Sequence, residues 1–192
     1  YIAAVNWKKA EEYIAQGKYK EWPSEYYHNY YDEHTHMATA DKKKGVKVLI
    51  PSECPGLVYD LPTPKSPHGV DVTPDGKFIV GSGKLSADLT VHSFDKMLAA
   101  IDAKKFDGEA YGIPILKFED VLAGVVKSGG LGPLHTEFDG KGNAYTTFFI
   151  SSEVVKWKLG TWEVLDRQPT FYSVGHLMIP GGNSAKPFGK YV

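Results

Sequence analysis

Three histidines each stand behind a proline or glycine and in front of a strand-like run of residues. They are His68 in Ser66-Pro67-His68-Gly69, His135 in Gly132-Pro133-Leu134-His135, and His176 in Val174-Gly175-His176. If the three runs belong to successive β units around an axis, the repeat delivers three imidazoles to one shared point. Neutral imidazole binds copper, zinc, iron and nickel, so the pattern predicts a transition-metal site without identifying the metal.

A single histidine at the start of a strand is more often structural than a metal ligand. Duplication could also have copied a residue that serves only packing within each unit. The flanking Gly or Pro recurs with the histidine, however, and this favours a backbone that must approach something closely. The nearest carboxylates, Asp71 and Glu137, stand two or three positions along the strands, which gives little support to a facial triad or a hydrolytic zinc site.

The other histidines give weaker signals. His28, His34 and His36 lie in an aromatic stretch without helical or strand periodicity, for which a solvated loop is the favoured interpretation. His92, within Val91-His92-Ser93, is predicted to be an exposed strand position.

The elements that must position the three histidines follow a repeated order of histidine, strand, glycine turn and aromatic strand. The histidines are 67 and 41 residues apart, and a helical excursion at residues 95–126 accounts for the longer spacing. The expected strands are 1–5, 46–50, 69–73, 78–81, 89–94, 135–138, 144–150, 153–159, 162–165 and 177–179, with residues 186–192 as a turn entering a strand. The expected helices are 7–16 after the N-cap Asn6, 96–104 capped by Asp95, and 118–126.

A unit of about 40 to 45 residues made of short strands is typical of a β-propeller blade. We therefore predict an all-β fold in which residues 1–192 form part of a β-propeller, about four blades or parts of blades, with short helical insertions. Residues 22–44 are predicted to be a flexible loop or insertion. Open blades would expose sheet edges, so a closed ring is expected in the complete protein.

Composition narrows the function classes. The 192 residues are 42% hydrophobic, so we expect a sizeable core. The net charge is −1, so we expect no long-range electrostatic field that would recruit nucleic acid. Cys54 is the only cysteine, which excludes an internal disulfide or a thiolate cluster. No apolar run approaches the roughly 20 residues of a membrane span. The chain begins at Tyr1 and stops within strand-like residues, so we expect an internal piece of a longer protein.

Several segments together resemble the nitrous-oxide reductases. The matching residues are Ser66-Pro67-His68-Gly69, Pro74-Asp75-Gly76-Lys77, Ser82-Gly83-Lys84-Leu85-Ser86, Gly130-Leu131-Gly132-Pro133-Leu134-His135-Thr136, Phe138-Asp139-Gly140-Lys141-Gly142-Asn143-Ala144-Tyr145-Thr146 and Val154-Val155-Lys156-Trp157. The run from Gly130 to Trp157 is the most specific. The short Gly175-His176-Leu177 falls in the right order.

The resemblance implies a seven-bladed propeller whose axis holds a tetranuclear copper-sulfide cluster with seven histidine ligands. It assigns His68, His135 and His176 as three of them, and the backbone carbonyl of Ser66 as a calcium ligand. A binuclear copper centre in a C-terminal cupredoxin domain would lie outside these residues. The implied reaction is reduction of nitrous oxide to dinitrogen and water, the last step of denitrification. The resemblance also implies a periplasmic homodimer that receives electrons from a c-type cytochrome or a cupredoxin.

The alternative is a non-catalytic propeller that serves as a binding scaffold, of the surface-layer or lactonase-like type. Such propellers share the Pro-Asp-Gly-Lys turn of residues 74–77 but do not need a histidine at the head of each blade.

Overall fold

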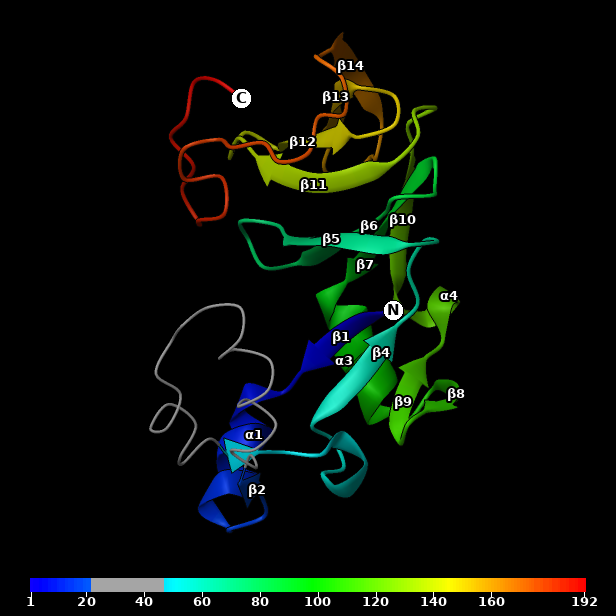
Figure 1. The fold of residues 1–192 in the computed structure, drawn as a ribbon, viewed down its shortest axis with the longest axis vertical. Helices are drawn as coiled ribbons and strands as arrows, with labels where there is room; N and C mark the ends of the chain where they lie inside the picture. The colour runs from blue at the N-terminus through cyan, green and yellow to red at the C-terminus, as the bar shows by residue number, and fades with distance from the viewer. Residues whose placement is uncertain (22–46) are drawn as a thin grey trace, which may run out of the picture. The chain divides into compact units, whose positions relative to one another are not determined.

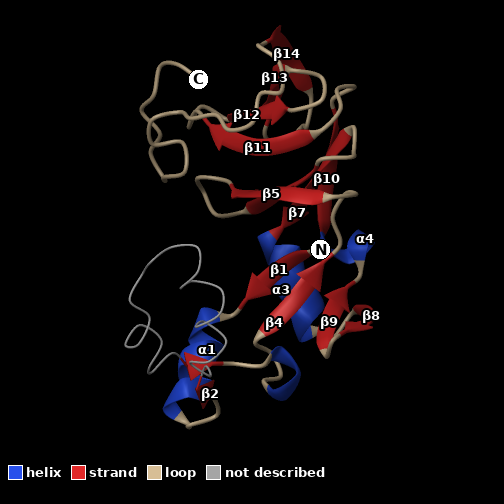
Figure 2. Cartoon of the chain, viewed as in Figure 1, coloured by secondary structure: helices blue, strands red, loops and turns tan. Residues whose placement is uncertain are grey.

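Among the described residues β-strands are the most frequent regular element, formed by alternating apolar residues between glycine turns, and a few short helices join them (Figures 1 and 2). The computed structural model describes residues 1–21 and 47–192. These residues form two compact units, of which the larger comprises residues 1–3, 60–108 and 115–192. The smaller unit comprises residues 4–59 and 109–114. The insertion expected at residues 22–44, with His28, His34 and His36, lies outside the described residues.

The smaller unit contains the helix α1 (Trp7–Ala15). The side chain of Asn6 accepts a hydrogen bond from the backbone N–H of Lys9, as expected of an N-cap. A small apolar cluster of Tyr13, Cys54 and Leu57 forms its core. The short strands β2 (Lys20–Glu21) and β3 (Lys47–Val48) pair antiparallel, and η1 (Pro51–Glu53) is a 3-10 turn.

A further four-stranded sheet has the order β1-β4-β9-β8. The strands are β1 (Ile2–Val5), β4 (Val58–Leu61), β8 (Phe106–Ala110) and β9 (Ile113–Leu116). Strands β4 and β9 pair in parallel.

The first sheet that carries a candidate histidine has the order β10-β7-β6-β5, and all its neighbours are antiparallel. The strands are β5 (Pro67–Val72), β6 (Phe78–Gly83), β7 (Asp88–Ser93) and β10 (Leu122–Lys127). The helices α3 (Phe94–Asp102) and α4 (Phe118–Val121) lie in the long connection between β7 and β10. The residues between β7 and β10 are thus an insertion before β10, the strand of this sheet that comes last along the chain.

The second such sheet is an uninterrupted antiparallel meander, β11-β12-β13-β14. Its strands are β11 (Pro133–Phe138), β12 (Asn143–Phe148), β13 (Glu153–Lys158) and β14 (Val164–Pro169). The turn between β11 and β12 is held by Asp139, whose carboxylate accepts hydrogen bonds from the backbone N–H groups of Lys141 and Asn143.

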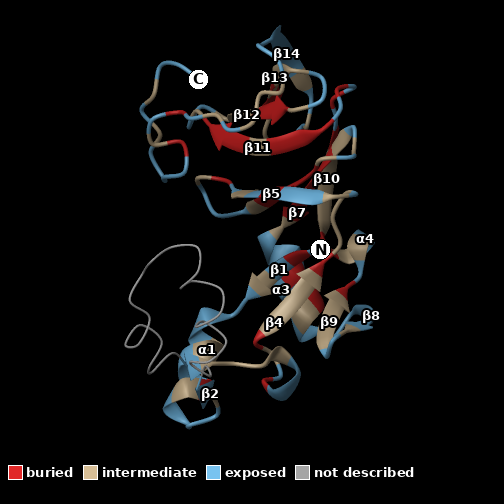
Figure 3. Ribbon diagram, in the orientation of Figure 1, coloured by how far each residue is buried: buried red, intermediate tan, exposed pale blue. Residues whose placement is uncertain are grey.

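One apolar core joins the two histidine-bearing sheets. Its fully buried members are Val80, Leu89, Val91 and Val126 from the first sheet and Phe138, Ala144, Phe148, Val155 and Trp157 from the second. Removing these side chains from water supplies the main favourable contribution to holding the sheets together. Figure 3 shows β11 as mostly buried and β5 as largely exposed.

Three predicted elements need correction. Residues 118–126 form one helical turn, α4, and then strand β10, because Leu122–Lys127 pairs along β7. The cap of α3 is Ser93, whose hydroxyl accepts the N–H of Lys96, and Asp95 lies in the first turn. Residues 170–192, all of which are described, form no strand, so the third unit expected after His176 is not built as a sheet.

Candidate functional site

His68 and His135 both sit in β-bulges. In β5, the three steps from Pro67 to Val70 are matched by two steps in β6, and the extra residue falls in the segment that holds His68. Strand β11 has the same irregularity between Pro133 and Thr136, opposite β12, and there it holds His135. A bulge bends the strand and redirects a side chain, and bulges are common beside functional sites. For His68 and His135, the repeat seen in the sequence is therefore also a repeat of local geometry.

The two bulged strands lie alongside each other (Figure 1). The backbone N–H of Thr136 in β11 donates a hydrogen bond of 2.8 Å to the Asp71 carboxylate of β5. Gly69 in β5 lies against the backbone of Leu134 in β11. These contacts bring the residues next to each histidine together.

The three imidazoles predicted from the sequence are brought together. The ring centroids of His68 and His135 lie 5.1 Å apart in an edge-on arrangement. Those of His135 and His176 lie 4.5 Å apart, and these two rings are stacked. His68 and His176 are exposed, whereas His135 is partly buried between them. The chain thus presents three imidazoles at one accessible place.

His176 is held in place by a side chain of the second sheet. It lies in the irregular segment that follows β14, and Thr147 of β12 donates a hydrogen bond of 2.5 Å to the carbonyl of Gly175, the preceding residue. The same hydroxyl accepts a longer hydrogen bond, 3.5 Å, from the backbone N–H of His135. Buried Thr147 therefore links the backbones of the two segments that carry the stacked rings.

The surroundings favour the neutral form of the central imidazole. Burial lowers the pKa of His135, and the neighbouring rings of His176 and His68 lower it further. A neutral imidazole has a free nitrogen lone pair, which is the form that binds a transition metal. The donor type and protonation state therefore suit copper or a similar ion. Over the described ranges, no set of three or more His, Cys, Asp or Glu side chains is arranged to hold a metal ion by itself.

Ser66, the predicted calcium position, has a left-handed backbone conformation with φ of 61°. Its carbonyl oxygen accepts a hydrogen bond of 2.8 Å from the backbone N–H of Lys84. A carbonyl oxygen has two lone pairs, so this bond leaves one for another partner.

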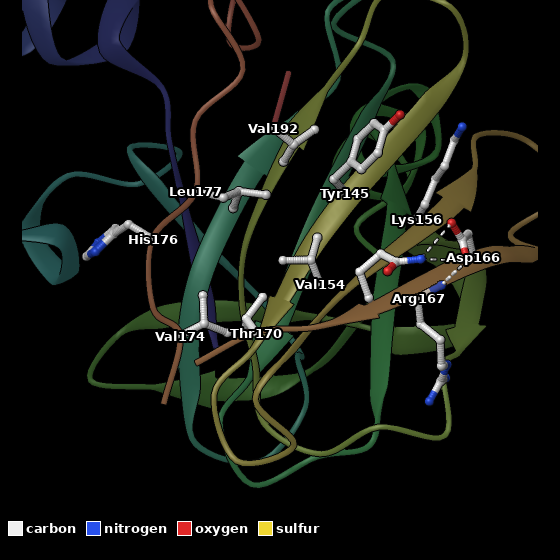
Figure 4. A pocket seen from close by; sticks show the side chains of 11 residues that line it. Tyr145, Val154, Lys156, Asp166, Arg167, Thr170, Val174, His176, Leu177 and Val192 are labelled. Atoms are coloured by element: carbon white, nitrogen blue, oxygen red, sulfur yellow. Dashed lines mark hydrogen bonds between the residues drawn. The ribbon is translucent and has the colours of Figure 1, made fainter. Parts of the chain in front are cut away.

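A cavity of about 420 Å³ lies beside the histidine cluster but is distinct from it. Its walls come from β12, β13, β14 and the final segment of the chain, and include Tyr145, Val154, Lys156, Arg167, Leu177 and Val192. Although His176 contributes to the lining, its ring points away from the other side chains drawn in Figure 4.

Comparison with known proteins identifies the relatives of this chain. It is 33% identical over 169 residues to the nitrous-oxide reductase of Ralstonia nicotianae, an alignment that covers 82% of the chain. It is 37% identical over 147 residues, 71% of the chain, to that of Cupriavidus necator, and 43% identical over 99 residues, 52% of the chain, to that of Stutzerimonas stutzeri. The chain belongs to the nitrous-oxide reductase family.

The match covers a limited part of these relatives. The chain spans 23%, 21% and 14% of the lengths of the nitrous-oxide reductases from Ralstonia nicotianae, Cupriavidus necator and Stutzerimonas stutzeri. No family model matches it.

Among solved structures, a hydrazine synthase from Kuenenia stuttgartiensis gives a TM-score of 0.39 at 16% identity, over 56% of this chain and 25% of that one. A Bacteroides uniformis protein described as a 6-phosphogluconolactonase gives 0.37 at 16% identity, over 67% of this chain and 34% of that one. Neither value reaches the level at which a shared fold is established.

The site also contains residues that the sequence did not single out as functional. The position of Asp71 along its strand does not fix which way its side chain points, and in the structure its carboxylate reaches β11. Thr147 gave no signal beyond its place in a predicted strand. The expectation that His92 is exposed was wrong: its side chain is 0% exposed and packs edge-on against Phe118. It stands apart from the three converging histidines.

Proposed function

We propose that this chain forms part of the catalytic copper centre of a nitrous-oxide reductase, which reduces nitrous oxide to dinitrogen and water. The observation that carries the proposal is the convergence of His68, His135 and His176, with ring centroids 5.1 and 4.5 Å apart, in a member of this family. Three residues separated by 67 and 41 positions in the sequence meet where the family resemblance assigns cluster ligands.

The role of the three histidines is to present neutral imidazoles from a rigid support. Two of them project from bulges in the neighbouring edge strands β5 and β11, and the third is held by a hydrogen bond from Thr147 to Gly175. Ligands on such elements hold a metal centre with little reorganisation. In the proposed cluster the histidine ligands would be distributed over several copper ions. These three side chains would therefore not have to bind one and the same ion.

When bound, a copper-sulfide cluster would supply a binding place for nitrous oxide and the two electrons that, with two protons, convert it to dinitrogen and water. The chain's own contribution is to hold and orient part of the ligand set. The four further histidine ligands and the binuclear copper centre would come from parts of the protein beyond residues 1–192.

The wider setting forms part of the same proposal. We propose a seven-bladed propeller in which the sheets β10-β7-β6-β5 and β11-β12-β13-β14 are blades. Each is a four-stranded antiparallel sheet, and in each the histidine lies in the edge strand that comes first along the chain. The carbonyl of Ser66 is proposed as a calcium ligand. A periplasmic homodimer that receives electrons from a c-type cytochrome or a cupredoxin is the arrangement expected for the complete enzyme. Over residues 1–21 and 47–192, no helix is long and apolar enough to span a membrane.

The deciding experiment measures copper content and visible absorption of the full-length protein, purified without oxygen, beside the variant His135→Ala. We expect copper with intense sulfide-to-copper absorption, and loss of most of that absorption in the variant. The matched control is His92→Phe, which removes a histidine of the same sheet assembly at a buried place away from the cluster. A folded protein that holds no copper, or one whose copper is indifferent to His135→Ala, would overturn the proposal and favour a scaffold propeller.

A further inference from the structure

We propose that Asp71 is a positioning residue for the candidate metal centre: it holds β5 and β11 in the register that brings the rings of His68 and His135 together. The inference rests on the proposed function, since the two histidines have a shared task only if they bind one centre.

The two strands are parallel neighbours at the free edges of their sheets. Strand β5 ends the order β10-β7-β6-β5, and β11 begins the order β11-β12-β13-β14. The Asp71 to Thr136 hydrogen bond joins residues 65 apart in the sequence, and the contact of Gly69 with Leu134 joins residues with the same separation. Two contacts with one sequence offset mean that the strands run in the same direction and in one register.

The edge position of β11 explains why a side chain is needed there. The N–H of Thr136 points away from the β12 ladder, and Thr136 is only 1% exposed, so this donor must find an acceptor within the protein. Asp71 supplies it at 2.8 Å. The bond therefore fixes β11 against β5 one residue beyond His135, where a shift of the strand would move the ring.

Asp71 also binds to a well-anchored point. The hydroxyl of Thr136 is hydrogen-bonded to that of Thr146 at 2.7 Å, and Trp157 donates its indole N–H to Thr146 at 2.9 Å. Trp157 and Thr146 are fully buried in the second sheet. Because the Asp71 carboxylate is hydrogen-bonded to this network, it fixes the position of β5 relative to the second sheet.

The cost of placing a carboxylate here argues for a functional role. Burial raises the pKa of Asp71 to about 6, the Thr136 N–H partly offsets this, and the charge of Glu137 raises it further. Burying this carboxylate lowers the stability of the fold. Such a cost is expected at a place where the side chain positions functional residues.

The test uses the full-length protein with Asp71→Ala, Asp71→Asn and the control Asp75→Ala. Asp75 belongs to the same hairpin, where its carboxylate accepts hydrogen bonds from Thr73 and the N–H of Lys77 in the turn. The control therefore weakens the hairpin without touching β11. Two quantities are measured: copper per protein with its visible spectrum, and amide hydrogen exchange of residues 134–138 in the metal-free protein.

We expect Asp71→Ala to lose at least half of its copper, to shift the spectrum of the remainder, and to exchange several-fold faster at residues 134–138. Asp71→Asn retains an oxygen acceptor of the same shape and should restore both readouts, while Asp75→Ala should keep its copper and its exchange in this segment. Full copper and an unchanged spectrum in Asp71→Ala would overturn the positioning role and leave the proposed function standing. If the wild-type protein holds no copper, the proposed function fails, and unchanged exchange in Asp71→Ala would then show that Asp71 does not fix β11 either.

Discussion

Gly69 lies so close to the backbone of Leu134 that no side chain fits between them. A Cβ on Gly69 would lie 1.7 Å from the carbonyl oxygen of Leu134 and 2.8 Å from its carbonyl carbon. Gly69 directly follows His68, and Leu134 directly precedes His135. The tight approach of β5 to β11 therefore falls beside two proposed ligands, and the spacing of their rings depends on a glycine at this position.

Replacing Gly69 by alanine should push the two strands apart. The clash is with backbone, which cannot rotate away as a flexible side chain can, so we expect a loss of stability of about 1–3 kcal/mol, the usual cost of overpacking. Copper content should fall several-fold, since His68 and His135 move apart. Denaturant unfolding and metal analysis of the full-length variant measure the two effects.

The control for this variant is Gly175→Ala. Gly175 also stands next to a proposed ligand, His176, but a Cβ there would have no atom within 4 Å among the described residues. Stability and copper content should both stay near the wild-type values. A Gly69→Ala protein with the same behaviour as this control would contradict the assigned approach of the strands.

The hydroxyl of Thr147 gives a second prediction. In Thr147→Val the carbonyl of Gly175 and the N–H of His135 both lose their partner at nearly unchanged side-chain volume. We expect a loss of about 1–3 kcal/mol if these groups stay buried, together with partial loss of copper because His176 is no longer held. Thr147→Ser keeps the hydroxyl and should retain most of the copper. Equal copper in the valine and serine variants would show that this hydroxyl does not position the ligand.

The sequence predicted the second sheet well because its strands are local. Residues 135–165 alternate, and their turns contain glycine and asparagine, so each strand pairs with the next along the chain. Strand β10 could not be predicted in this way. Residues 122–127 are a short apolar run that suits either a helix or a strand, and their pairing with β7, about 30 residues earlier, decides the outcome.

That error also explains the misjudged histidine. With β10 read as a helix, β7 becomes the outer strand of its sheet, and His92 is then expected to be exposed. In the structure β7 is an inner strand between β6 and β10, His92 lies opposite Leu122, and Phe118 packs on its ring. One missing strand pairing therefore changed the predicted surroundings of a titratable group.

The candidate site divides in a similar way. The convergence of its three histidines was predictable because each repeats with its flanking Gly or Pro, a signal contained in a few adjacent residues. The bulges, the approach of Gly69 and the roles of Asp71 and Thr147 depend on contacts between strands distant in the sequence. No local pattern carries that information, so these features emerge only from the folded chain.

Buried His92 should make folding stability depend on pH. Burial lowers the pKa of His92 from 6.5 to about 4, and the nearby carbonyl of Pro62 opposes this shift. Within the described part of the chain, neither ring nitrogen has a partner in hydrogen-bond geometry. Because the proton binds the unfolded chain more readily, the stability due to neutral His92 is complete above pH 6.5. It is lost as the pH falls towards 4, by about 3 kcal/mol.

The measurement is the urea midpoint of the full-length protein between pH 7.5 and 4, beside His92→Phe, which fills the same apolar place with a ring that does not titrate. Asp71 acts in the opposite direction, because its pKa of about 6 lies above its ordinary value and its neutral form is favoured by folding as the pH falls. It is present in both proteins, so the difference between the two curves isolates His92. We expect that difference to grow steadily below pH 6.5 in favour of His92→Phe. Curves that stay parallel down to pH 4 would mean that His92 is protonated as easily in the folded protein as in the unfolded one.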